Sequence, residues 1–176
     1  MMPAIHIVTV TPGQAQVLAD VSRQTFYDAF AAQNSAADME QHLEKTYNLL
    51  QITKELTSPH CRFYFAMAGD IVAGYMKLNF APAQTELHDA NALELERIYV
   101  VQNWQGQKIG QLLLNKAIAL VKELRLQYLW LGVWEHNAKA LAFYRRNGFV
   151  AFSTHHYTVG TDVQTDLMLK LDLLPA

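Results

Sequence analysis

The chain has 176 residues, of which 51% are hydrophobic and 17% are charged, and its formal net charge is −2. A chain of this length and composition can bury one sizeable core, so we expect a single domain over residues 1–176 rather than a disordered protein. The weak negative charge and the dispersed lysines and arginines argue against a nucleic-acid partner.

The first third of the chain predicts one strand followed by three helices. "IHIVTV" is typical of a strand over 5–10, and Thr11-Pro12-Gly13-Gln14 resembles a capping box with proline at the first helical position. A second helix is expected to start at Asn34-Ser35. A third follows Asn48 and ends before Ser58-Pro59, because the residue ahead of a proline avoids the helical region.

The middle of the chain changes to a strand pattern. "RFYFAMA" and "IVAGYMKLNF" flank Gly69-Asp70, a two-residue hairpin signal, and "ALELERIYV" predicts another strand after a loop over 82–91. The apolar positions of "IGQLLLNKAIALVKEL" repeat at helical spacing. "YLWLGV" is then typical of a short buried strand.

The last part of the chain predicts a helix and a hairpin. "NAKALAFYRRNGF" indicates a helix that ends at Gly148, with Phe149 placed for the hydrophobic contact that follows a glycine C-cap. The tail over 150–171 is expected to form two strands that turn at Gly160-Thr161-Asp162.

A strand–helix–strand connection within one sheet predicts a parallel pair, here 93–100 with 128–133. The fold class is therefore α/β (α+β), with a mixed central sheet flanked by helices. Ligands in such folds bind beyond the carboxyl ends of parallel strands, where helix N-termini point inward. This rule places the loop 102–110 at the expected binding position.

The loop "VQNWQGQKIGQLLL" carries two glycines directly before an apolar helix. Successive backbone N–H groups from Gly106 to Gln111 could cradle a diphosphate, and Lys108 adds a mobile cation. The alternative is a glycine-tolerant loop before a core helix, and the loop composition alone does not decide between them. A P-loop is excluded because no Ser or Thr follows Lys108 to hold magnesium.

With its flanks, this stretch resembles the acyl-CoA-binding motif Q/R-x-x-G-x-G/A of the GCN5-related N-acetyltransferase (GNAT) family. Gln105 matches the first position and Gly110 the last, whereas Lys108 stands where the family usually has its middle glycine. Lys108 fits if its φ is helical and its side chain points outward. "LGVWEHNAKALAFYRRNGF" resembles the second conserved block of the family. Together with "LERIYV", "QTDLMLKL" and "TFYDAF", it is similar to the PaiA-type branch, which is associated with polyamines.

The resemblance implies a GNAT fold with splayed parallel strands that bind acetyl-CoA as co-substrate, and it implies no metal. Backbone groups of Ile98 and Val100 would pair with the pantetheine chain. Asn137 would bridge to the same chain, cap the following helix, or do both. The implied cofactor-binding residues are Ile98, Tyr99, Val100, Gln105, Gly106, Gln107, Lys108, Ile109, Gly110, Gln111, Asn137 and Tyr144.

The resemblance also implies two catalytic residues. Tyr144 would protonate the departing thiolate, and its alternative role is to pack its helix against the sheet. Glu96 would act as general base toward the amine, and it lies two residues from Glu94, so both side chains project from one strand face. The alternative for both carboxylates is simple solvation on a half-exposed strand, which is the interpretation we adopt for Glu94.

The region 26–47 would form the acceptor wall, and its carboxylates Asp28, Asp38, Glu40 and Glu44 would suit a polyamine unless they only form a solvated helix face. His155 and His156 lack a partner at metal-ligand spacing, and the single Cys61 excludes an intramolecular disulfide and is expected to pack.

No apolar run is long enough to span a membrane and the start does not resemble a signal peptide, so we expect a cytoplasmic protein without a membrane partner. The predicted function is acetyl transfer from acetyl-CoA to a primary amine of a small molecule, with a polyamine favoured, in a ternary complex. The alternatives are acetylation of a protein N-terminus or lysine, and a CoA-binding regulatory domain without turnover. A homodimer is left open.

Overall fold

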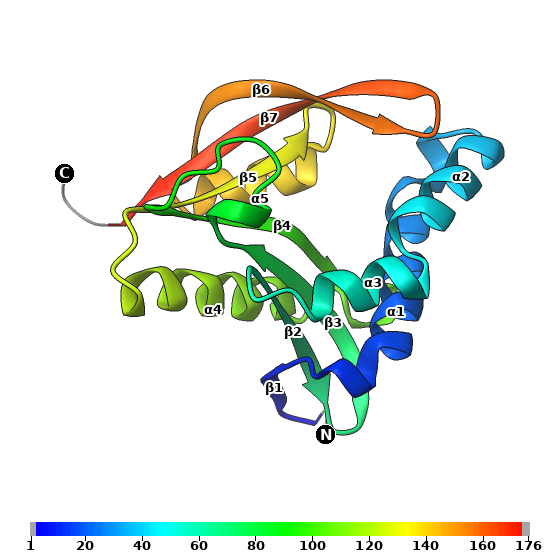
Figure 1. The fold of residues 1–176 in the computed structure, drawn as a ribbon, viewed down its shortest axis with the longest axis horizontal. Coiled ribbons are helices and arrows are strands. Elements are labelled where there is room, and N and C mark those ends of the chain that lie inside the picture. Colours follow the sequence, from blue (N-terminus) through cyan, green and yellow to red (C-terminus); the bar gives the residue numbers. More distant parts are fainter. Residues whose placement is uncertain (1–2, 174–176) are drawn as a thin grey trace.

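The computed structural model describes residues 3–173 and contains a seven-stranded sheet with helices on both faces (Figure 1). The strands are β1 (Ile5–Thr9), β2 (Cys61–Ala68), β3 (Ile71–Asn79), β4 (Ala92–Val100), β5 (Tyr128–Trp134), β6 (Val150–Val159) and β7 (Asp162–Asp172). The helices are α1 (Ala15–Phe30), α2 (Ala36–Thr46), α3 (Leu49–Leu56), α4 (Ile109–Glu123) and α5 (Ala138–Arg146).

The strand order is β1-β2-β3-β4-β5-β7-β6, and each pair is antiparallel except β4 with β5. The predicted mixed sheet with one parallel pair near its middle is therefore confirmed. The predicted hairpins are also present, because β2 joins β3 through Gly69-Asp70 and β6 joins β7 through Gly160-Thr161.

Short polar side chains start the helices where the sequence predicts. The Ser35 hydroxyl accepts the Asp38 N–H at 3.1 Å at the start of α2, and Asn48 Oδ1 accepts the Gln51 N–H at 2.8 Å at the start of α3. The predicted capping box before the first helix is present, because the Thr11 N–H donates to Gln14 Oε1 at 2.9 Å. Residues 12–14 form a single 3₁₀ turn, and the α-helix begins only at Ala15.

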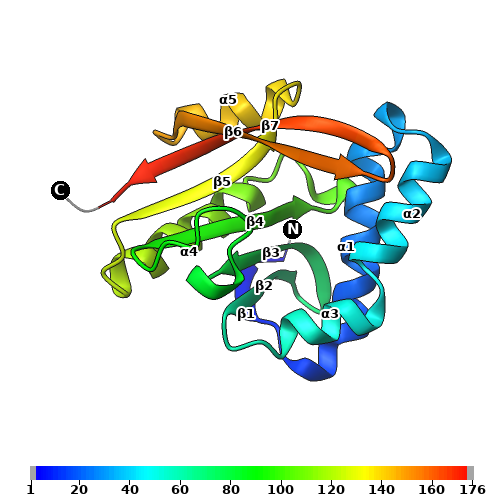
Figure 2. The same cartoon turned by 45° about the horizontal axis from the view of Figure 1, so that its top comes forward.

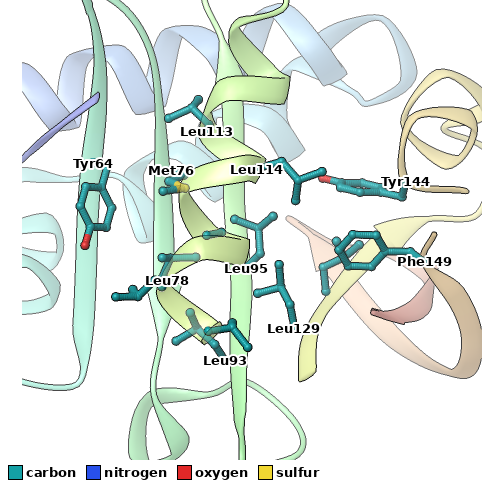
Figure 3. Close-up of a cluster of buried hydrophobic side chains, with 14 of the residues drawn as sticks. Tyr64, Met76, Leu78, Leu93, Leu95, Leu113, Leu114, Leu129, Tyr144 and Phe149 are labelled. Atoms are coloured by element: carbon teal, nitrogen blue, oxygen red, sulfur yellow. The ribbon is translucent and has the colours of Figure 1, made fainter. Parts of the chain in front are cut away.

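Two apolar clusters hold the layers together, one on each face of the sheet. Helices α4 and α5 cover one face, and α1, α2 and α3 cover the other (Figure 2). Figure 3 shows the cluster beneath α4, where the helix stacks its leucines on the middle strands and Tyr144 lies beside Phe149. Its members include Met76, Leu78, Leu93, Leu95, Leu113, Leu114, Leu129, Tyr144 and Phe149.

The parallel strands β4 and β5 part after a short contact. Their pairing covers three positions and ends at Glu94 with Trp130, so it is shorter than the predicted pairing of 93–100 with 128–133. The register of β3 against β4 shifts at the same level, because Lys77 pairs with Arg97 and Leu78 pairs with Leu95. Glu96 is thus the extra residue of a β-bulge. Such bulges bend a strand and redirect its side chains, which accounts for the divergence of β4 from β5.

Candidate active site

A pocket lies where β4 and β5 diverge, and it collects residues from both faces of the sheet. The diverging strand ends form its middle, α5 contributes one side, and α1 together with the β6–β7 hairpin contributes the other. The lining residues are Phe26, Phe30, Tyr47, Leu95, Glu96, Arg97, Ile98, Tyr99, Gly132, Val133, Trp134, Asn137, Ala140, Tyr144, Tyr157, Val159, Gln164 and Asp166. Five of the predicted site residues, Glu96, Ile98, Tyr99, Asn137 and Tyr144, therefore share one pocket.

The predicted diphosphate loop precedes α4 and has an unusual backbone. Gly106 has φ 81°, and Lys108, the N-cap residue of α4, has φ 61°. The prediction of a helical φ for Lys108 is therefore wrong, because the residue adopts the left-handed conformation that glycine prefers. The exposed Lys108 thus keeps the backbone path of a glycine and adds a charged side chain.

The N-terminus of α4 lacks the capping group that other helices here possess. Its N-cap side chain makes no hydrogen bond, and its first turn contains no acidic residue. Within residues 3–173 the N–H groups of Ile109, Gly110 and Gln111 have no hydrogen-bond acceptor. Unpaired N–H groups and the positive end of the helix dipole favour an anion at this position.

Two glutamines of the loop support its surroundings. Gln105 donates from Nε2 to the Val100 carbonyl at 3.3 Å, and its Oε1 lies 3.4 Å from the Lys139 ammonium. Gln111 donates from Nε2 to Asn147 Oδ1 at 2.8 Å, which ties the start of α4 to the end of α5. These contacts place Lys139 as a second cation near the loop, one that sequence spacing did not indicate.

Asn137 caps α5 and also lines the pocket. Its Oδ1 accepts the Ala140 N–H at 3.1 Å at the start of α5, which confirms the capping alternative. Asn137 also lines the pocket, and the cap uses only its Oδ1. Its amide nitrogen can therefore still donate to a cofactor chain, as predicted.

Tyr144 is held by the end of α5. The helix closes with N–H bonds from Gly148 to the Arg145 carbonyl and from Phe149 to the Tyr144 carbonyl, and Gly148 has φ 87°. This Schellman motif places the Phe149 ring 5.5 Å from the Tyr144 ring, as the sequence predicts. Tyr144 is buried, and burial raises the pKa of its phenol well above the ordinary value. The phenol therefore stays protonated, as a proton donor must.

Glu96 belongs to a buried ion network that also contains Glu55, Lys77 and Arg97. The Lys77 ammonium lies 2.5 Å from Glu96 and 3.2 Å from Glu55, and the Arg97 guanidinium binds both carboxylates. Although burial opposes its charge, Arg97 and Lys77 lower the pKa of Glu96 to about 2. A carboxylate stabilised in this way is a poor proton acceptor. The general-base role of Glu96 therefore stays a prediction, and this ion network argues against it.

Glu94 differs from its prediction as well. It is buried rather than solvated, and it accepts hydrogen bonds from the backbone and the hydroxyl of Thr85 and from the Asn79 amide. Asn79 also donates to Glu96 at 2.6 Å, which confirms that the two glutamates share one strand face. Glu94 thus anchors the loop after β3 and lies outside the pocket.

The helical part of the acceptor side is aromatic rather than acidic. Phe26, Phe30, Tyr47, Tyr99 and Tyr157 line this side of the pocket, whereas none of the four predicted helix carboxylates does. Those carboxylates have other surroundings: Asp28 accepts from Gln24, Asp38 binds Ser35 and Thr161, Glu44 pairs with Arg23, and Glu40 is exposed. The predicted polyamine wall on 26–47 is therefore not formed by these residues.

The tip of the β6–β7 hairpin is fixed to α2 (Figure 1). Asp38 Oδ1 accepts hydrogen bonds from the Thr161 N–H at 2.6 Å and the Thr161 hydroxyl at 2.8 Å. Gly160 has φ 61°, and a Cβ there would lie 2.3 Å from Asp38, so only glycine permits this approach. We call the Asp38–Thr161 contact the hairpin latch. It joins the two elements that border the acceptor side.

The part of the chain that the structure describes holds no group of three His, Cys, Asp or Glu side chains that could bind a metal ion. No helix among these residues is long and apolar enough to cross a membrane. Cys61 is half-buried beside the apolar cluster under α1–α3, in agreement with a packing role.

Comparison with known proteins now adds to this geometry. Residues 23–149 match the model of the acetyltransferase (GNAT) family. The uncharacterized N-acetyltransferase in pepI 3′ region of Lactobacillus delbrueckii subsp. lactis is 40% identical over 173 residues, which cover 98% of this chain and all of that protein. The spermine/spermidine N(1)-acetyltransferase of Bacillus subtilis is 25% identical over 139 residues, covering 76% of this chain and 85% of that one.

Among solved structures, the PaiA N-acetyltransferase of Thermoplasma acidophilum in complex with coenzyme A has the same fold. It superposes with a TM-score of 0.79 over 96% of this chain and 99% of its own, at 22% identity. The diverging β4 and β5, the open N-terminus of α4 and these matches define an acetyltransferase. The chain belongs to the GNAT family of N-acetyltransferases.

Proposed function

We propose that this N-acetyltransferase transfers the acetyl group of acetyl-CoA to a primary amine of a small molecule, by direct transfer in a ternary complex. The observation that carries the proposal is the placement of Tyr144 and the diverging β4–β5 ends in one pocket, next to an α4 N-terminus with unpaired N–H groups. The thioester and the amine can therefore meet without a covalent enzyme intermediate.

The residues present fit acetyl-CoA. Unpaired N–H groups at 109–111 suit its diphosphate, with Lys108 and Lys139 as nearby cations. Ile98, Tyr99 and Val100 lie beyond the last β4–β5 pair, so backbone groups on that side of β4 are free to bind a pantetheine chain as an added strand. Asn137 lines the same pocket.

The reaction requires balanced proton movement. An ammonium group must lose one proton before its nitrogen attacks the thioester carbon, and the nitrogen loses a second proton as the amide forms. The departing thiolate takes up one proton, so one proton per turnover reaches solvent. Tyr144 is the group that donates to the sulfur, because its buried phenol is protonated and borders the pocket.

Two features favour a small amine over a protein acceptor. The hairpin latch ties the β6–β7 hairpin, which borders the acceptor side, to α2, and such a tie would restrict the entry of an extended peptide. The aromatic lining offers ring faces that can bind an ammonium group. A polyamine therefore remains a candidate acceptor, supported by the spermine/spermidine acetyltransferase relative. Acetylation of a protein N-terminus or lysine is the alternative.

The test is a thiol-release assay with acetyl-CoA across polyamines, arylalkylamines, aminoglycosides and N-terminal peptides. We expect turnover with at least one small amine and none with peptides. Turnover with peptides and with no small amine would show that the acceptor is a protein amine instead of a small molecule. A folded protein that binds CoA but acetylates nothing would instead indicate a regulatory CoA-binding domain.

A further inference from the structure

Three ionisable side chains form a chain that leads from the pocket to the surface. His155 on β6 contacts Asp166 on β7 through Nε2 at 3.3 Å, and it contacts Glu86 in the loop before β4 through Nδ1 at 2.8 Å. Asp166 is buried and lines the pocket, whereas Glu86 is exposed. We call this chain the Asp166 relay. Sequence spacing gave His155 no partner, since Glu86 lies 69 residues away.

The relay depends on a glycine in the neighbouring strand. Gly132 on β5 also lines the pocket, and a Cβ there would lie 2.8 Å from His155 Nε2 and 3.2 Å from Asp166 Oδ2. Real Cβ atoms do not approach other heavy atoms as closely as 2.8 Å. The His155 imidazole and the Asp166 carboxylate therefore occupy the space that a side chain at position 132 would need. The absence of a side chain at Gly132 therefore leaves the room in which His155 meets Asp166 at the pocket.

The relay supplies the unbalanced negative charge of the pocket. Three charged residues line the pocket, and two of them, Glu96 and Arg97, pair with each other inside the ion network. The third is Asp166. Its Oδ2 faces His155, and Oδ1 has no hydrogen-bond partner among residues 3–173. His155 is shared with Glu86, so two carboxylates flank one imidazole and at least one negative charge remains.

We propose that Asp166 binds the ammonium group of the acceptor and takes its proton, with His155 and Glu86 holding Asp166 and passing the proton to solvent. This inference rests on the proposed function and assigns the base to Asp166 in place of Glu96. The proton moves from nitrogen to the Asp166 carboxylate, and the freed lone pair forms the N–C bond as the C–S bond breaks. The hydrogen bonds to Asp166 and Glu86 raise the pKa of His155, so its imidazole can accept a proton from Asp166 at Nε2 while Nδ1 releases one toward Glu86.

A binding experiment tests the inference without turnover. Tyramine and spermidine are titrated calorimetrically into protein saturated with CoA. We expect at least one to bind the wild type, and Asp166→Asn to weaken that binding about tenfold or more while CoA affinity is unchanged. Equal amine affinity in Asp166→Asn, or no binding of either amine to the wild type, would overturn the inference. If an amine binds through Asp166 but is not acetylated, the assignment of Asp166 as the ammonium site would hold and the proposed function would be wrong.

The pH profile separates a base from a structural residue. With an amine that is acetylated, Asp166→Asn is expected to lower kcat/KM about 100-fold at pH 7. The ratio of wild-type kcat/KM to that of Asp166→Asn should shrink at least about tenfold between pH 7 and pH 9.5, because far more of the acceptor is already a free amine at the higher pH. The groups that face the carboxylate are His155 and Tyr157 from β6, with Glu86 behind His155. A deficit that is constant with pH would overturn the base role.

Two further variants provide a matched comparison. His155→Gln should reproduce part of the Asp166→Asn loss, and Gly132→Ala should do the same, because its methyl group displaces the imidazole. His156→Gln is the control, since His156 neighbours His155 on β6 but is exposed. Wild-type kinetics in both His155→Gln and Gly132→Ala would contradict the relay.

Discussion

The Lys77 ammonium lies 2.5 Å from Glu96 Oε2, and this contact joins neighbouring strands at the point where β4 bends away from β5. Lys77 also binds Glu55 on α3, so the helix layer is fastened to the sheet beneath the pocket. Two carboxylates and two cations balance each other in this network. Breaking one member would leave an uncompensated buried charge, which is costly.

Glu96→Gln is therefore expected to reduce stability rather than to remove a base. The lowered pKa of Glu96, about 2, means that its stabilisation is fully present above about pH 4.5 and is lost as the pH falls through about 2. We expect the variant to lose about 3 kcal/mol in urea unfolding at pH 7, with a smaller difference at pH 3.5. Glu40→Gln on exposed α2 is the control. If the rate of Glu96→Gln no longer rises with pH as the wild-type rate does, Glu96 would be supported as the general base.

Tyr144→Phe keeps the ring that contacts Phe149 and removes only the proton donor. We expect kcat to fall about 100-fold or more when chemistry limits the rate, with CoA affinity and melting temperature near wild type. Single-turnover measurements with acetyl-CoA report the chemical step directly. Phe143→Leu is the control on the same helix, because Phe143 does not line the pocket. Full single-turnover rates in Tyr144→Phe would show that the tyrosine only packs.

Substitutions at Lys108 distinguish what the loop backbone contributes to CoA binding from what the lysine side chain contributes. Because its φ is 61°, Lys108→Gly should keep the loop and remove strain, so stability should stay equal or rise by up to about 1 kcal/mol. CoA affinity should fall only a few-fold in Lys108→Gly and in Lys108→Ala, owing to loss of one charge.

Lys108→Pro should abolish CoA binding, since proline cannot adopt a positive φ. Circular dichroism checks that this variant folds. Calorimetric CoA affinity in Lys108→Pro equal to wild type would show that the diphosphate does not use this loop.

The hairpin latch should control which acceptors enter. Asp38→Ala removes both bonds to Thr161, so we expect KM for the small amine to rise about three- to tenfold while CoA affinity is unchanged. Peptide amines, which we expect the wild type to reject, should gain measurable turnover. The exposed Glu40→Ala on the same helix is the control. Unchanged KM and an unchanged acceptor range in Asp38→Ala would mean that the latch has only a structural role.

Much of the fold followed from local sequence signals. Caps at Ser35, Asn48 and Asn137, the Gly69-Asp70 hairpin and the Gly148 helix end depend on residues within a few positions of each other, and all five are present. The mixed sheet followed from the order of elements. The expectation of a homodimer stays a prediction.

The chemistry around the site was harder to predict, because it depends on distant partners and on a bulge. Regular alternation would separate Glu96 from Arg97, whereas at the bulge Arg97 and Lys77 each bind both Glu96 and Glu55. Arg97 and Glu55 are 42 residues apart. Spacing within one strand therefore located Glu96 at the pocket but gave no indication of the two cations that lower its pKa.

The central claim is that acetyl-CoA lies between β4 and β5 with its diphosphate on the N-terminus of α4. A crystal structure of the protein with CoA tests it most directly. The account predicts diphosphate oxygens within hydrogen-bond distance of N–H groups at 106–111 and the thiol end in the pocket beside Tyr144. CoA bound elsewhere, or a loop whose N–H groups point away from it, would contradict the account.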